Sequence, residues 1–149
     1  MLSDQKIEET FLLLYHTVPQ DQQDEAIQFL IDNIGEKLEM LVLPIPESSP
    51  INPKMMWDNA ARVIVGIGEE GIAGHFPKIF EWLQDINWPG SRQILDFLAD
   101  IDTDTIEPHL KAAEAKAESA GDPEWIYNLG LLREERQRRH APITTPQPT

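Results

Sequence analysis

Residues 82–89 read Trp82-Leu83-Gln84-Asp85-Ile86-Asn87-Trp88-Pro89, and this stretch joins two segments of similar helical design. A proline ends one helix and can open the next, because it lacks a backbone N–H and has a fixed φ. The side chains of Asp85 and Asn87 can accept hydrogen bonds from the backbone at a helix start. We therefore predict a joint between two helices, in which Asp85 or Asn87 caps the second helix and Pro89 begins it.

The tryptophans of the chain fall near the expected boundaries between helical units: Trp57, Trp82, Trp88 and Trp125. Indoles at such places fill gaps between helices. Alternatively, some of them line a concave face as binding anchors. We favour the gap-filling role and predict that Trp88→Ala costs about 3 to 5 kcal/mol, whereas a fully exposed Trp88 would contradict this and indicate binding. The candidate binding residues are Asp58, Trp82, Asp85, Asn87, Trp88 and Trp125.

Apolar residues recur at helical spacing on both sides of the joint, so we predict an all-α fold. The predicted helices begin near residues 3, 21, 53, 72, 89, 103 and 123. Thr103 or Thr105 can cap the helix that starts there, and Gly121-Asp122-Pro123 provides a stop, a cap and a first-turn proline.

Proline content suggests how these helices are grouped. Residues 44–52 are rich in proline and serine, which favours an extended linker. We therefore predict an N-terminal helical cap over residues 1–43, this linker over 44–52, a repeat domain over 53–139, and a disordered tail over 140–149.

The prolines expected to open helices are regularly spaced, because Pro53, Pro89 and Pro123 lie 36 and 34 residues apart. A period of this length with two helices per unit is typical of an α-solenoid, in which each hairpin buries its face against its neighbours. Faces of Leu, Ile and Ala, together with Pro77 early in a second helix, favour HEAT-like repeats. We predict a short HEAT-like α-solenoid.

The W-L-x-D-x-N-W-P pattern of residues 82–89 also resembles the signature of a bacterial family, domain of unknown function five-zero-seven-one. Further matches in kind are Pro53-Lys54, Asp58, Ile106-Glu107-Pro108-His109-Leu110, Asp122 and Trp125. The resemblance covers about residues 52–132 and implies a compact HEAT-like helical domain without an assigned activity. The chain departs from the family pattern in its N-terminal extension, at Gly90-Ser91, and in an alanine-rich stretch near residues 112–120.

The net charge of −14 limits the classes of partner. It repels nucleic-acid phosphates and anionic membranes, attracts basic proteins, and opposes self-association. No stretch is long and apolar enough for a membrane span, and the first residues lack the pattern of a secretory signal. We therefore expect a cytoplasmic monomer that binds a basic protein and neither nucleic acid nor membrane.

Motifs that could carry chemistry fail in their context. Residues 66–71 match the dinucleotide pattern G-x-G-x-x-G, but they lie between helical segments instead of following a strand. Asp100-Ile101-Asp102-Thr103-Asp104 resembles the start of a calcium loop, but Thr105 and Lys111 occupy the positions that need Gly and Glu. Cysteine is absent and the histidines are isolated, so we predict no metal, no cofactor and no catalytic residue.

Two hypotheses for function follow. The leading one is a non-catalytic protein-binding module of the immunity or adaptor type, whose acidic surface meets a basic partner such as a toxin. The alternative is a small-molecule-binding protein or an enzyme with a pocket near Asp85, in which Asp85, Glu81 and His109 supply the polar groups. The alternative predicts a deep cavity lined by these three side chains.

Overall fold

The computed structural model describes residues 6, 9–10, 12–14, 17–34 and 57–140. All regular structure in these ranges is helical, which confirms the all-α class. The elements are η1 (Leu12–Leu14), α2 (Gln20–Asn33), α3 (Trp57–Gly71), η4 (Ala73–His75), α4 (Phe76–Phe80), η5 (Glu81–Gln84), α5 (Ser91–Asp100), α6 (Thr103–Ser119) and α7 (Pro123–His140). The predicted linker over 44–52 and the tail from residue 141 onward lie outside the described residues.

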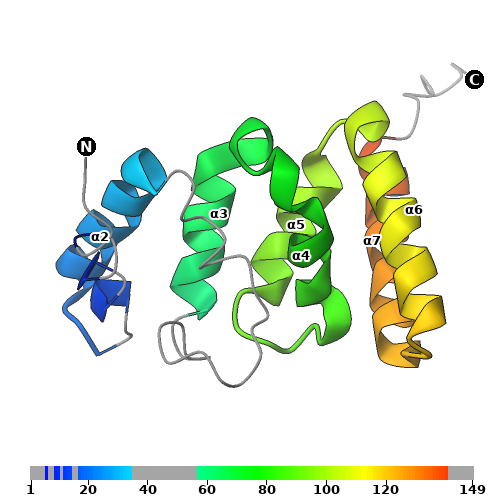
Figure 1. Ribbon diagram of the computed structural model, residues 1–149, viewed down its shortest axis with the longest axis horizontal. Helices are drawn as coiled ribbons and strands as arrows, with labels where there is room; N and C mark the ends of the chain where they lie inside the picture. The colour runs from blue at the N-terminus through cyan, green and yellow to red at the C-terminus, as the bar shows by residue number, and fades with distance from the viewer. Residues whose placement is uncertain (1–5, 7–8, 11, 15–16, 35–56, 141–149) are drawn as a thin grey trace, which may run out of the picture.

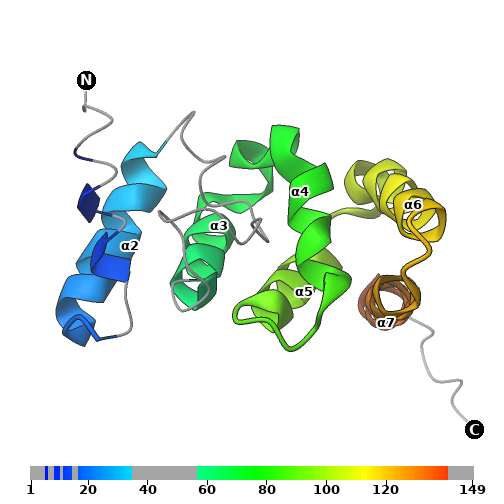
Figure 2. The ribbon, with the colours of Figure 1, turned by 60° about the horizontal axis from the view of Figure 1, so that its bottom comes forward.

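The helices stand side by side in a row along the long axis of the molecule, with α2 at one end and the α6–α7 pair at the other (Figure 1). Helices α3, α5 and α7 contact one another in turn, while α4 packs on α6 (Figure 2). The described helices from α3 onward therefore form two layers. The HEAT-like interpretation stays a prediction, and the segment expected to pair with α3 as one helix is in fact broken into η4, α4 and η5.

Helix α2 packs on α3 through an apolar stripe. The buried side chains on α2 are Ala26 and Leu30, and Ile34 follows at its end. A buried amide reinforces this contact, because Asn59 on α3 donates hydrogen bonds to the carbonyl oxygen of Leu14 at 2.8 Å and to Oε1 of Gln23 at 2.9 Å. The polar link fixes η1, α2 and α3 in one arrangement.

The N-terminal caps of α5, α6 and α7 can be compared with the predicted ones. Helix α5 begins at Ser91 and not at Pro89, and its N-cap is Gly90 at φ 88°, so neither Asp85 nor Asn87 caps it. Helix α6 is capped by Asp102, which accepts from the amides of residues 104 and 105; the prediction of Thr103 or Thr105 was wrong. At α7, Asp122 accepts from the amide of Trp125 at 3.0 Å, as predicted.

Candidate functional site

The joint at residues 82–91 is held together by a close approach of backbone and indole. The Ser91 hydroxyl donates a hydrogen bond of 2.7 Å to the carbonyl oxygen of Trp82. Gly90 is so tightly surrounded that a Cβ there would lie 2.7 Å from Cζ3 of Trp82 and 2.8 Å from the carbonyl oxygen of Trp57. The Gly90-Ser91 pair is therefore what allows the chain to turn against the buried indole.

Three indoles pack together beside this turn. The rings of Trp57 and Trp82 are 5.8 Å apart at 58°, and those of Trp57 and Trp88 are 5.4 Å apart in an edge-to-face arrangement. Trp82 is fully buried, whereas Trp88 is half-buried and packs against the core. Trp88 is therefore neither a free anchor nor a full core residue.

Trp125 is buried on α7 and ties this helix to the segment before the joint. Its indole N–H donates to the carbonyl oxygen of Phe80 at 3.1 Å, and Asn128 one turn later donates to that of Leu83 at 2.8 Å. Trp82 and Trp125 lie inside the protein, where a partner on the surface does not reach them. Among the candidate binding residues, Asp58 and Asn87 are exposed, and Asp85 and Trp88 are partly so.

The polar candidates at the joint make local contacts. Asp85 accepts a hydrogen bond of 2.8 Å from the amide of Asn87, which stabilises the turn. Asp58 accepts one of 2.6 Å from Nε2 of Gln93, which links α3 to α5, and lies 3.7 Å from Arg62. Asp58 and Asp85 therefore hold the joint and its neighbouring helices together through local contacts.

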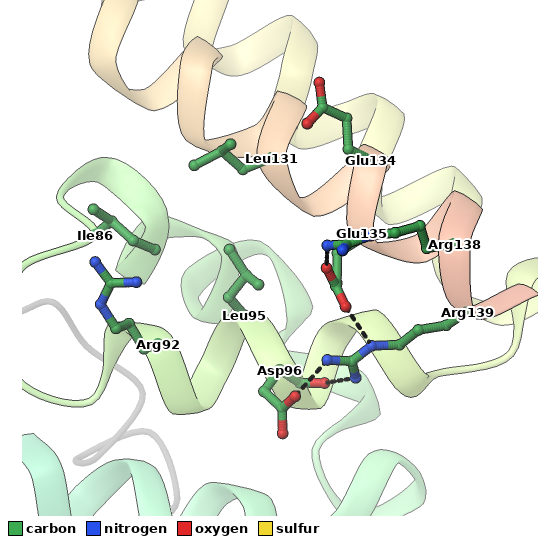
Figure 3. A pocket seen from close by; sticks show the side chains of 9 residues that line it. All are labelled: Ile86, Arg92, Leu95, Asp96, Leu131, Glu134, Glu135, Arg138 and Arg139. Atoms are coloured by element: carbon green, nitrogen blue, oxygen red, sulfur yellow. Dashed lines mark hydrogen bonds and ion pairs between the residues drawn. The ribbon is translucent and has the colours of Figure 1, made fainter.

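A pocket of about 370 Å³ opens next to the joint, between α5 and α7 (Figure 3). We call it the α5–α7 pocket. Its lining residues are Ile86, Arg92, Leu95, Asp96, Leu131, Glu134, Glu135, Arg138 and Arg139. None of them was among the sequence candidates. Apart from Ile86, which belongs to the joint, they stand at helical spacing on α5 and α7, a pattern that also fits an ordinary solvated face.

The arginines of α7 are used inside the protein. Arg133 binds Glu107 at 2.8 Å and Glu114 at 2.7 Å, joining α7 to α6. This contact lowers the pKa of the Glu107 carboxyl and raises that of the guanidinium. Arg139 binds Asp96 and Asp100 on α5. The basic run that the sequence shows at the end of α7 is therefore largely neutralised by neighbouring carboxylates.

The three polar side chains proposed for the alternative function, Glu81, Asp85 and His109, make contacts with different neighbours. Glu81 pairs with Lys116 at 3.0 Å. His109 stacks on Phe76, with ring centroids 4.5 Å apart, and lines a small cavity of about 90 Å³. Asp85 lines neither this cavity nor the α5–α7 pocket, although the latter includes its neighbour Ile86. In the described part of the chain, no group of three or more His, Asp or Glu residues is placed to hold a metal ion.

Together these features define an all-α protein of layered helices, with a close-packed tryptophan joint and an open pocket rimmed by charges. The chain belongs to the family described as Domain of unknown function (DUF5071), whose model matches residues 53–140. The match spans α3 to α7 and thus includes the joint and the pocket, while α2 lies before it. No curated protein and no solved structure matches the chain. Over the described residues, no helix has the length and apolar character of a membrane span.

Proposed function

We propose that this chain is a non-catalytic protein-binding module, of the immunity or adaptor kind, that uses an acidic surface against a basic partner. The observation that carries the proposal is that cations and carboxylates differ in how many of them form ion pairs within the protein. The α7 arginines are bound to internal partners, whereas many exposed carboxylates form no ion pair within the described residues. Among these carboxylates are Asp21, Asp24, Glu25, Asp32, Glu70, Asp102, Asp104, Glu118, Glu124 and Glu134.

The unpaired negative charge is densest at the α2 end of the row. Helices α2 and α3 contain one cation, Arg62, which lies 3.7 Å from Asp58, and Lys6 lies over the ring of Phe29 on α2. Their acidic residues are Asp21, Asp24, Glu25, Asp32, Asp58, Glu69 and Glu70. A surface of one sign attracts an oppositely charged protein over a distance of about 10 Å at 0.1 M salt. The outer face of α2, with the adjoining end of α3, is therefore the surface we assign to the basic partner.

The partner is sought by co-expressing the chain with the products of neighbouring genes and recovering complexes at low salt. The purified partner is then titrated against the wild-type chain and against Asp21→Asn/Glu25→Gln/Asp32→Asn. A matched control, Asp104→Asn/Glu118→Gln/Glu124→Gln, removes the same charge from α6 and α7. We expect the α2 variant to bind at least tenfold more weakly than the control. Failure to recover any basic protein rejects the proposal.

We further propose that the chain works as a cytoplasmic monomer. The net charge of −14 opposes close association of two copies. The lack of cysteine suits a reducing compartment, where disulfides do not form. Sedimentation at low and high salt checks the oligomeric state, and a stable dimer at low salt contradicts it.

One observation favours the alternative function of small-molecule binding or catalysis near Asp85. The α5–α7 pocket, at about 370 Å³, falls within the range of small-molecule sites and includes Ile86, the neighbour of Asp85. A thermal-shift screen with metabolites and metal ions tests this. A hit that is lost in Leu131→Trp, which fills the pocket, supports the alternative; no shift with any compound eliminates it.

A further inference from the structure

We propose that the α5–α7 pocket binds a short segment of a protein partner in which an apolar side chain lies between an acidic and a basic residue. The inference rests on the protein-binding function proposed above, but it concerns a different surface from the acidic face of α2. Its support comes from the floor of the pocket and from two charges at its rim.

The floor of the pocket is apolar and concave. Ile86 from the joint, Leu95 from α5 and Leu131 from α7 line it, and each is only partly buried (Figure 3). Tyr127 lies one turn before Leu131 on the same side of α7 and is 67% exposed. The apolar strip therefore continues beyond the pocket. A partly covered strip of this kind gains stability when an apolar side chain of a partner removes it from water.

Most charges at the rim are already neutralised. The pocket is lined by Arg92, Arg138 and Arg139 and by Asp96, Glu134 and Glu135. Arg139 binds Asp96 at 2.5 Å and Glu135 at 3.0 Å, and Arg138 also binds Glu135. Arg92 and Glu134 remain without a partner among the described residues. They stand on opposite helices, Arg92 beside Ile86 and Glu134 beyond Leu131 (Figure 3).

These two charges specify the occupant. A guanidinium without a carboxylate partner recognises a carboxylate through two parallel hydrogen bonds, and a free carboxylate attracts Lys or Arg. The pocket itself has equal numbers of acidic and basic residues, so the overall charge of the chain does not select what enters it. The positions of the two unpaired charges select the occupant instead. They fit a segment with an acidic residue toward Arg92, an apolar anchor over Leu95, and a basic residue toward Glu134.

The test uses a phage-displayed library of random twelve-residue peptides, panned on the immobilised full chain. A charge-reversed variant, Arg92→Glu/Glu134→Lys, keeps the net charge of −14. A matched control, Lys78→Glu/Glu118→Lys, exchanges an equally exposed pair elsewhere on the molecule. We expect enriched peptides with an apolar residue between an acidic and a basic one. As synthetic peptides, they should bind the charge-reversed variant at least tenfold more weakly and the control unchanged.

The opposite polarity should be enriched when the charge-reversed variant itself is panned. No enriched pattern, or peptides that bind all three proteins equally, overturns the inference. The inference is also overturned if the full chain forms a dimer that the Arg92→Glu/Glu134→Lys variant does not form, because a second copy of the chain would then occupy the pocket. Urea unfolding confirms that the variants are folded. The acidic face of α2 is unchanged in every variant, so failure here leaves the salt-dependent binding of a basic partner to be judged separately.

Discussion

The guanidinium of Arg136 on α7 donates a hydrogen bond of 2.6 Å to the carbonyl oxygen of Ile101, just after the end of α5. The same group donates to the carbonyl oxygens of Leu98 and Ala99 and to the Thr103 hydroxyl. Arg136 is only 5% exposed. A buried cation thus lies at the negative end of the α5 dipole and donates to the carbonyl oxygens of its last turn and of the residue that follows it.

Replacing this cation should be among the costly single changes in the family domain. Arg136→Met leaves the carbonyl oxygen of Ile101 without its donor and removes the hydrogen bonds to Leu98, Ala99 and Thr103, so we expect a loss of about 2 to 3 kcal/mol in the free energy of unfolding. Urea denaturation measures it. Arg138→Met is the control, because Arg138 is exposed and its one ion-pair partner among the described residues is Glu135 on the same helix; it should change stability by no more than about 0.5 kcal/mol. Equal effects would refute the capping role.

The two tryptophans of the joint should differ in their contribution to stability. Trp82 is fully buried, so Trp82→Ala should cost about 3 to 5 kcal/mol. Trp88 is half-buried, so we lower the expectation for Trp88→Ala to about 2 kcal/mol, most of it from the contact with Trp57. Thermal and urea unfolding of both variants provide the comparison. A Trp88→Ala variant as stable as the wild type would contradict a structural contribution from Trp88.

Gly90 should not tolerate a side chain. It has φ 88°, and a Cβ there meets Trp82, Ala61 and the backbone of Trp57. Gly90→Ala should therefore destabilise the protein by about 2 to 4 kcal/mol. At Gly130 on α7 an added Cβ would meet no atom within 4 Å, so Gly130→Ala should stabilise the protein by about 0.5 to 1 kcal/mol. Calorimetry of the pair separates local strain from a general response to Gly→Ala changes.

The link between α6 and α7 should depend on pH. The hydrogen bonds from Arg133 hold the pKa of Glu107 below its ordinary value. A lowered folded-state pKa stabilises the protein above the unfolded-state pKa, and this contribution is lost as the pH falls through the folded-state pKa. Arg133→Gln should therefore cost about 1 kcal/mol at neutral pH and progressively less below about pH 4. Unfolding of both proteins across this range tests it; a difference that grows in acid would contradict it.

The helices and their buried faces could be predicted because apolar spacing reports directly which side of a helix is covered. Phe76, Ile79, Phe80 and Leu83 are buried, as their spacing indicated. The same spacing did not reveal the breaks between η4, α4 and η5, because 3-10 and α turns share nearly the same apolar pattern. The start of α5 was misplaced for a related reason: the space around Gly90 depends on where Trp82 and Trp57 meet, which no local pattern encodes.

The candidate site was less predictable than the fold. Trp82 and Trp125 drew attention because indoles often bind partners, yet their burial depends on tertiary packing. Most of the four arginines of α7 bind groups on α5 and α6 that are distant in the sequence, and a local pattern does not reveal such pairs. For the same reason Arg92 and Glu134 became notable only once their neighbours were seen to be paired among themselves.

The central claim is that the acidic face of α2 binds a basic protein. The most direct measurement is the affinity of the recovered partner for the wild-type chain and for Asp21→Asn/Glu25→Gln/Asp32→Asn across a range of salt concentrations. We predict that wild-type affinity falls steeply as salt rises, and that the α2 variant binds more weakly with a shallower salt dependence. An affinity that is unaffected by salt and is the same for both proteins would contradict the claim.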